Sequence, residues 1–438
     1  MITPADPQRR LNRQDYKTLS LAALGGALEF YDFIIFIFFA AVMGKLFFPP
    51  DMPEWLRQLQ TFGIFAAGYL ARPLGGIVMA HFGDKAGRKK MFSLSILLMA
   101  LPTLMMGLLP TYAAIGITAP LLLLLLRIMQ GAAIGGEVPG AWVFVAEHVP
   151  HKRIGFACGT LTAGLTVGIL LGSFVATLLN TFMTPQGILQ GGWRIPFFLG
   201  GVFGLVAMYL RRWLRETPVF IEMKARKTLA RELPLKSVVM NHKKAVLISM
   251  LLTWLLSAGI VVVILMAPLW LQQQMGAAPG LALRANCAAI VALAVGCVIT
   301  GAVIDRAGAG RTFIIGCVML GIFSWLFYHT GADRPALLYL TYALAGLSVG
   351  VVGGVPYVMV HAFPSAVRFS GISFSYNVAY AIFGGLTPVL VTMLMRISPM
   401  APSWYVCGLA VMGVILGVCL PSGLRHQPPL AGGLNSIA

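Results

Sequence analysis

The chain has 438 residues, of which 58% are hydrophobic and 11% charged, and it carries a formal net charge of +18. A soluble domain carries about 25% charged residues, so this composition excludes an ordinary water-exposed fold and favours lipid as the surrounding solvent. The bases lie in turns between apolar runs rather than in a patch interleaved with aromatics, which argues against a nucleic-acid partner.

The apolar runs predict the secondary structure, because a membrane-spanning helix needs about 20 apolar residues. The runs are continuous rather than alternating in short pieces, which favours helices over the strands of a barrel. We predict an all-α membrane protein with twelve transmembrane helices. In chain order they cover 19–48, 57–80, 90–111, 119–147, 154–181, 194–213, 244–272, 285–304, 312–331, 335–362, 367–396 and 402–421.

The distribution of Lys and Arg predicts the orientation of these helices. With the N-terminus inside, most of these bases fall on cytoplasmic segments, so both termini are predicted to be cytoplasmic. One long polar connection separates six helices from the next six, which is typical of a transporter built from two repeated bundles. The predicted units are a tail (1–18), a six-helix bundle (19–213), a cytoplasmic linker (214–243), a second six-helix bundle (244–421) and a second tail (422–438).

A charged turn follows the second apolar run of each half. The first copy is Gly83-Asp84-Lys85-Ala86-Gly87-Arg88-Lys89-Lys90 and the weaker second copy is Asp305-Arg306-Ala307-Gly308-Ala309-Gly310-Arg311. The two copies lie about half the chain apart. They support the interpretation of two similar halves.

Five ionisable side chains lie well inside the predicted spans, all of them in the first half: Glu29, Asp32, Arg72, Arg127 and Glu137. Each costs about 2.5–3.5 kcal/mol at the centre of a spanning helix. They are therefore expected to face the bundle interior, a partner or water, and to carry function.

The acids among them are candidates for proton coupling. Glu29 and Asp32 are three residues apart and share a helix face. Arg127 is followed by Gly131 and Gly135, which allow a close helix approach, so Asp32 is predicted to reach Arg127. An ion pair that opens when Asp32 takes up a proton would couple proton binding to helix movement. The alternative is a static pair that only fixes packing, and Glu137 is a further candidate.

Arg72 is the first candidate for solute binding. It stands in Ala71-Arg72-Pro73-Leu74-Gly75-Gly76, where the proline breaks backbone bonds and the guanidinium is suited to a carboxylate. The alternative is an arginine that bonds carbonyls and stabilises a broken helix. The full set of predicted solute-binding residues also includes Arg127 and Tyr31 from the first half and neutral side chains from the second half. These are Tyr376, Asn377 and Tyr380.

No enzyme motif appears in the sequence. It contains no GxxxxGK[ST] phosphate loop, no HExxH and no GxSxG, and its six cysteines form no CxxC pair. The seven histidines are scattered. We therefore expect no catalytic residues, no metal and no cofactor, with a proton gradient as the energy source.

In its charged turn and in the motifs around its buried charges, the chain resembles the major facilitator superfamily, and more closely its metabolite:proton symporter family. Besides the charged turn, the resemblance is carried by short motifs in order along nearly the whole chain. They are Leu28-Glu29-Phe30-Tyr31-Asp32-Phe33, Ala71 to Gly76, Arg127 to Gly131 with Gly135-Gly136-Glu137, Gly192-Trp193-Arg194-Ile195-Pro196-Phe197, Glu216-Thr217-Pro218-Val219-Phe220, Phe363 to Gly371, and Phe383 to Pro388. Phe30 replaces a common Trp, and Ala309-Gly310 replace paired bases.

The resemblance implies a twelve-helix fold with alternating access and proton-driven uptake of a small organic solute. Family substrates include citrate and other carboxylates, 2-oxoglutarate, shikimate, proline and betaine. It also implies a cytoplasmic gate. Its predicted members are Gly83, Asp84, Gly87, Arg88, Glu147, Arg153, Asp305 and Arg311.

Two substrate classes remain open, with the organic acid preferred because two arginines lie inside the membrane. A zwitterion such as proline or betaine is the alternative, its cation held by Glu29, Glu137, Phe33 and Tyr31. A sensor that keeps the fold without transporting, and a drug exporter, are less favoured. We expect a monomer in the bacterial inner membrane whose partners are the solute, protons and the lipid bilayer.

Overall fold

A computed structural model describes residues 13–76, 88–135, 137–211, 235–330, 334–363 and 368–420. These residues form helices and no strand. The helices of the first half are α1 (Arg13–Phe38), α2 (Ala40–Phe47), α3 (Glu54–Leu70), α5 (Arg88–Leu108), α6 (Tyr112–Ile115), α7 (Thr118–Ile134), α8 (Glu137–His148), α9 (Ile154–Phe182), α10 (Pro185–Gln190) and α11 (Ile195–Arg211). Those that follow are α13 (Leu235–Asn241), α14 (Lys243–Ile260), α15 (Ala267–Gln274), α16 (Pro279–Ala307), α17 (Ala309–Tyr328), α18 (Pro335–Val349), α19 (Val355–Ala362), α20 (Arg368–Ala379), α21 (Gly385–Met395) and α22 (Ala401–Cys419).

Ten helical stretches in these ranges are long and apolar enough to cross a membrane. They coincide with ten of the predicted spans. The other two predicted spans, 57–80 and 90–111, contain α3 and α5, but residues 77–87 lie outside the described part of the chain. The helical membrane fold is therefore confirmed, whereas twelve crossings and the orientation of the termini stay predictions.

Several predicted spans are not continuous α-helices, which corrects the sequence-based expectation. A 3-10 segment at Gly350–Gly354 joins α18 to α19, and π-helical segments occur at Val261–Met266 and Tyr380–Gly384. Prolines 356, 268 and 388 explain the three breaks, because a proline cannot donate to the carbonyl four residues before it. That carbonyl lies inside the irregular segment in all three cases, so the bonding pattern shifts locally.

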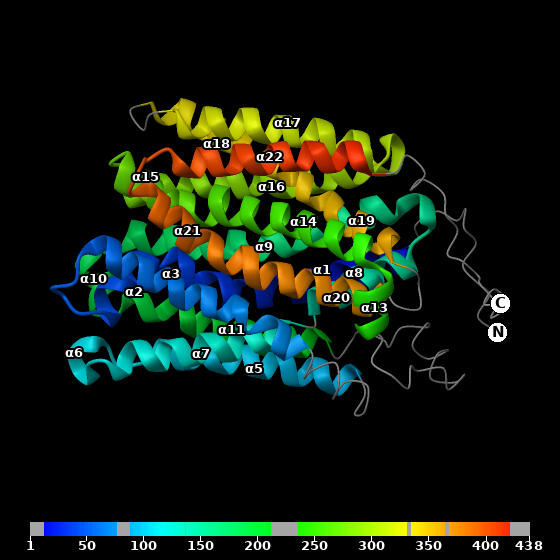
Figure 1. Cartoon of the computed structure of the whole chain (residues 1–438). Coiled ribbons are helices and arrows are strands. Elements are labelled where there is room, and N and C mark those ends of the chain that lie inside the picture. The colour runs from blue at the N-terminus through cyan, green and yellow to red at the C-terminus, as the bar shows by residue number, and fades with distance from the viewer. Residues whose placement is uncertain are drawn as a thin grey trace.

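The long helices run side by side, with α17, α18 and α22 along one flank and α5 and α7 along the other (Figure 1). In the first half, α1 packs against α9 and α11, and α5 against α7 and α11. In the second half, α16 and α17 pack against α18, and α17 also packs against α22. The halves meet where α9 contacts α16, α3 contacts α21 and α8 contacts α20.

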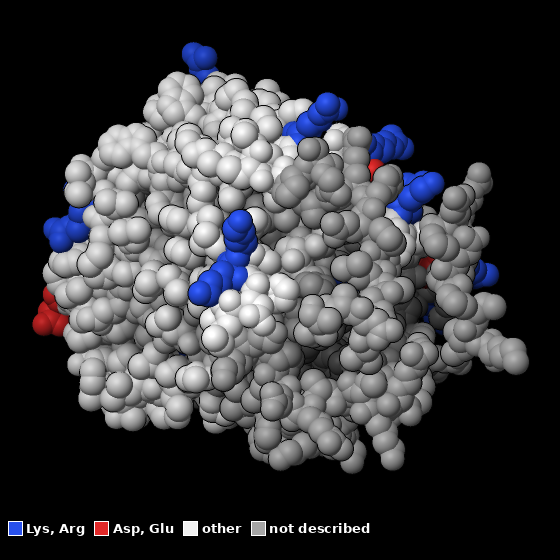
Figure 2. Space-filling view, turned by 45° about the vertical axis from the view of Figure 1, so that its right-hand side comes forward, with Lys and Arg blue, Asp and Glu red and all other residues white. Residues whose placement is uncertain are grey.

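The described residues on the face shown in Figure 2 are mostly uncharged. On the face in Figure 2, Lys and Arg stand at separate positions and form no continuous patch. Large apolar side chains point outward from the flanking helices, including Leu121, Leu125, Ile315, Ile322 and Val411. A contiguous apolar surface of this kind suits hydrocarbon rather than water.

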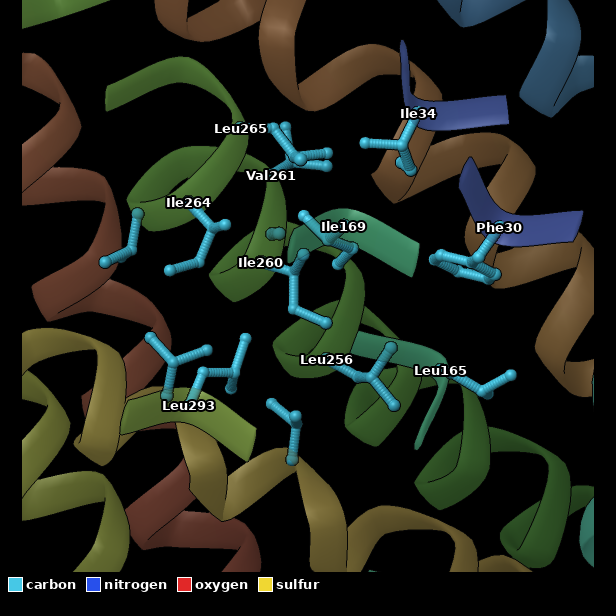
Figure 3. Close-up of a cluster of buried hydrophobic side chains, with 14 of the residues drawn as sticks. Phe30, Ile34, Leu165, Ile169, Leu256, Ile260, Val261, Ile264, Leu265 and Leu293 are labelled. Atoms are coloured by element: carbon cyan, nitrogen blue, oxygen red, sulfur yellow. The ribbon is translucent and has the colours of Figure 1, made fainter. Parts of the chain in front are cut away.

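An apolar cluster fills the space where the two halves face each other (Figure 3). Phe30 and Ile34 of α1 and Leu165 and Ile169 of α9 come from the first half. From the second half come Leu256 and Ile260 of α14, the adjoining π-helical residues Val261, Ile264 and Leu265, and Leu293 of α16. The cluster is buried, so the halves are closed on each other at this level.

Candidate functional site

Arg72 lies at the centre of the candidate site, just after the end of α3. Its side chain is 1% exposed, and its Nε, Nη1 and Nη2 atoms have no hydrogen-bond partner within 3.5 Å. The guanidinium carbon instead lies 4.4 Å from the ring centroid of Tyr380, 5.4 Å from Tyr69, 5.5 Å from Tyr376 and 5.8 Å from Phe33. These four rings are called the aromatic cage below.

The cage is built by both halves of the chain. Phe33 belongs to α1 and Tyr69 to α3, whereas Tyr376 belongs to α20 and Tyr380 begins the π-helical segment. The rings contact one another: Tyr69 and Tyr380 have centroids 5.3 Å apart, and Tyr376 and Tyr380 4.7 Å. All four residues are buried. A ligand held here would contact both halves at once, as alternating access requires.

Arg127 lies next to the cage but does not form the predicted ion pair with Asp32. Its Nη1 donates to the carbonyl of Phe33 (3.0 Å) and to Oε1 of Gln130 (2.8 Å), while Nε and Nη2 have no partner. Gln130 in turn donates to Thr103 Oγ1 (2.6 Å). The Phe33 ring lies 4.2 Å from the Arg127 guanidinium carbon. Carbonyl and amide dipoles therefore hold Arg127 in this arrangement.

Asp32 faces away from Arg127, toward α5 and α11. Its side chain is 2% exposed, and Oδ1 has no hydrogen-bond partner. The space for the carboxyl exists because α11 carries Gly200 there: a Cβ at that position would lie 2.5 Å from Asp32 Oδ1 and 2.6 Å from Thr103 Cγ2. The structure thus corrects the predicted Asp32–Arg127 contact and places the carboxyl in a notch at Gly200.

Gly200→Ala is expected to destabilise the protein, because the new methyl group overlaps Asp32 and Thr103. Overpacking of this kind costs about 1–3 kcal/mol of unfolding free energy. The adjacent Gly201→Ala is the matched control, since its nearest neighbour is a flexible leucine atom at 3.1 Å. Thermal unfolding of both variants in detergent checks this. Equal melting temperatures would show that Asp32 does not occupy the notch.

The other predicted solute-binding residues take different places. Tyr31 does not join the cage: its hydroxyl donates to the carbonyl of Pro196 (2.8 Å) and its ring packs on Phe203 of α11. Asn377 lies between the halves and donates to the carbonyl of Gly135 at the end of α7. Glu29 and Glu137 lie in α1 and α8, but their side chains are outside the described part of the structure.

Three of the residues predicted to form the gate, Asp305, Arg153 and Arg311, are described by the structure, and Asp305 lies at one end of the contact between α9 and α16. Asp305 accepts hydrogen bonds from the backbone N–H groups of Gly155 and Phe156, both at 2.8 Å, and so joins α16 to the first turn of α9. Arg153 and Arg311 are exposed there. Gly83, Asp84 and Gly87 lie outside the described residues, as do the side chains of Arg88 and Glu147.

Sequence reasoning missed four residues of the site: Tyr69, Trp142, Gln130 and Thr103. Trp142 of α8 packs edge-on against Tyr376 (5.0 Å), and its Nε1 has no partner. Aromatic side chains in apolar helices are usually core, which hides such residues. One signal was present for Tyr69, which precedes Arg72 by three residues and so shares its helix face.

This architecture, a helical membrane fold whose halves meet at a buried charged and aromatic site, defines a transport protein. The sequence model of the Major Facilitator Superfamily matches residues 23–388. The chain therefore belongs to the major facilitator superfamily, as the sequence motifs predicted, and as a transporter it acts on a small solute in a membrane.

Relatives and solved structures agree with this assignment. A putative proline/betaine transporter of Staphylococcus aureus (strain COL) is 32% identical over 91% of this chain and 87% of its own length. The proline/betaine transporter of Salmonella typhimurium is 31% identical, over 95% and 85%. Among structures, the partially occluded inward-open xylose transporter of E. coli superposes with a TM-score of 0.74 at 17% identity, covering 93% of this chain and 97% of that one. At this identity the likeness concerns the fold.

Proposed function

We propose that the protein is a proton-coupled symporter that takes up a small zwitterion of the proline or betaine type. The observation that carries the proposal is the buried guanidinium of Arg72, which lacks hydrogen-bond partners inside a cage of four aromatic rings. The location we propose is the bacterial inner membrane, in line with the bacterial relatives.

Two parts of a zwitterion match the two chemical features of this site. A cation–π contact contributes about 0.5–2 kcal/mol, whereas an uncompensated buried charge costs several kcal/mol. The rings offset part of that cost but leave the N–H donors of Arg72 unsatisfied. A solute carboxylate would satisfy these donors in a bidentate pair, and aromatic faces bind ammonium groups, including quaternary ones.

The names of the relatives also favour a zwitterion as the solute. One, from Dickeya dadantii, is a glycine betaine/proline/ectoine/pipecolic acid transporter, 31% identical over 95% of this chain. The preference of the sequence analysis for an organic acid is not supported by these relatives. That class stays the second candidate on one observation: Arg127 also keeps two nitrogens without partners, so two guanidinium groups could serve one polycarboxylate.

For the proton we propose Asp32 as the carrier. A carboxyl group that is buried and whose Oδ1 has no partner is costly to keep ionised, so its charge state is sensitive to any rearrangement of its surroundings. Gln130 and Phe33 hold Arg127 while Asp32 is apart from it. A rearrangement that brings the two charges together would favour proton release, which links the proton to the conformation.

Transport into proteoliposomes tests this proposal. Purified protein is reconstituted, an inward proton gradient is imposed, and the uptake of labelled proline, glycine betaine, citrate and 2-oxoglutarate is followed. We expect proline or betaine to accumulate and the accumulation to collapse with a protonophore. Gradient-driven accumulation of citrate or 2-oxoglutarate instead would select the organic-acid candidate, and accumulation that survives the protonophore would remove proton coupling.

A further inference from the structure

The position of the Arg72 guanidinium suggests a role in selecting the solute, an inference that rests on the proposed function. The guanidinium carbon lies within 6 Å of four ring centroids, the range over which a cation is attracted to an aromatic face. The nearest face, that of Tyr380, is 4.4 Å away. A cation of the protein itself thus occupies the cage that would hold the ammonium group of a solute.

Two cations do not share such a cage at low cost, because like charges repel strongly where water is excluded. A solute with only an ammonium group would have to displace Arg72 and leave the guanidinium buried without a counter-ion. A solute with only a carboxylate could form an ion pair with Arg72. If that ion pair drew the guanidinium away from the aromatic rings, however, no other cation would take its place there. Neither solute compensates both groups.

A zwitterion compensates both in one exchange. Its ammonium group takes the place of the guanidinium on the rings, and its carboxylate pairs with the displaced Arg72 through the three nitrogens that have no partner here. The net charge of the site is unchanged by this binding. Because Tyr376 and Tyr380 come from the second half and Arg72 from the first, the exchange changes a contact between the halves.

We propose that Arg72 acts as a resident cation: it occupies the aromatic cage before the solute binds, and yields it only to a solute that brings its own carboxylate. Arg72 is then the residue that determines specificity for zwitterions over simple onium compounds. The aromatic rings alone cannot discriminate between these two classes of solute, because a trimethylammonium group has the same structure in a zwitterion and in a simple onium compound.

Three ligands of nearly equal shape isolate this effect. Glycine betaine carries both charges, choline carries the same trimethylammonium group without a carboxylate, and 3,3-dimethylbutyrate keeps the carboxylate with carbon in place of nitrogen. Binding to detergent-purified protein is measured by calorimetry. For the wild type we expect betaine to bind at least about tenfold tighter than either of the others.

The decisive variant is Arg72→Met, which removes the charge and keeps a long apolar chain. We expect its betaine affinity to fall by at least about tenfold and its choline affinity to rise, so that choline becomes the better ligand. Arg72→Lys keeps a resident cation, so it is expected to exclude choline as the wild type does. Gly408→Ala, at a site with no atom within 4 Å of the new Cβ, controls for expression and handling.

The outcomes separate this inference from the proposed function. A wild type that binds betaine, with an Arg72→Met variant that still prefers betaine over choline, would overturn the resident cation and leave the zwitterion transporter intact. A wild type that binds choline as tightly as betaine would also overturn the resident cation and leave the zwitterion transporter intact. This comparison needs no variant, so it tests the inference even if Arg72→Met does not fold. A wild type that binds no zwitterion but binds citrate would remove both.

Discussion

Asp32→Asn is expected to abolish proton-driven accumulation of the solute while leaving exchange of labelled for unlabelled solute intact. The amide keeps the size of the side chain in its notch at Gly200 but cannot take up and release a proton. With one proton per solute, a gradient of one pH unit sustains about tenfold accumulation. The variant should therefore equilibrate the solute at a ratio of about one, since its conformational change no longer depends on the gradient.

Proteoliposomes measured in two modes check this prediction, once with an imposed proton gradient and once with excess unlabelled solute inside. Asp51→Asn, the same chemical change at an exposed position, serves as the control and should behave as the wild type. If Asp32→Asn still accumulates the solute to the wild-type ratio, Asp32 is not the proton carrier.

Gly301→Val is expected to stop transport by forcing α9 and α16 apart where Asp305 joins them. A Cβ at Gly301 would lie 2.4 Å from the carbonyl oxygen of Gly155 and 3.1 Å from the Cα atom of Gly159, so the contact depends on hydrogen in place of a side chain. Backbone cannot yield as a side chain does. We therefore expect the conformation opened at this end to predominate, with at least about tenfold faster labelling of the fully buried Cys158.

Labelling of Cys158 with a maleimide reports this opening when the remaining cysteines, which are the buried Cys297 and Cys317 and the more accessible Cys287, Cys407 and Cys419, are replaced by alanine. Gly408→Val makes the same change where the added Cβ meets nothing within 4 Å, and it should leave the labelling rate unchanged. Unaltered protection of Cys158 in a folded Gly301→Val protein would contradict the close α9–α16 contact.

Much of the architecture follows from the sequence because each spanning helix needs one long apolar run, and that requirement is local. The breaks were harder to place. A proline at 268, 356 or 388 indicates that the helix is disturbed, but whether the chain before it forms a 3-10 or a π-helical segment depends on the packing of neighbouring helices. Composition likewise showed that Arg72 and Arg127 must be shielded from lipid, since a buried charge is costly wherever it lies.

The partners of those charges could not be predicted in the same way. Asp32 and Arg127 have opposite charge and both lie inside predicted spans, so an ion pair was a natural expectation. In the structure the Asp32 carboxyl lies beside Gly200, a residue of α11 far along the chain. Arg127 instead donates hydrogen bonds to the carbonyl of Phe33 and to the side-chain amide of Gln130. The cage was missed in part for the same reason: Tyr69 and Tyr380 meet only after the halves assemble.

Among the described residues the buried charges are distributed unevenly between the halves, so we expect the membrane voltage to act mainly on the first half. Within the described residues, the charged side chains that are buried are Asp32, Arg72 and Arg127, all in the first half, whereas the second half offers Tyr376, Asn377 and Tyr380. Moving one elementary charge across the membrane is worth about 2.3 kcal/mol per 100 mV. A zwitterion has no net charge, so we expect the proton carried by Asp32 to be the charge that moves in response to the membrane voltage. The transport current is therefore expected to measure the number of protons transported rather than the amount of solute.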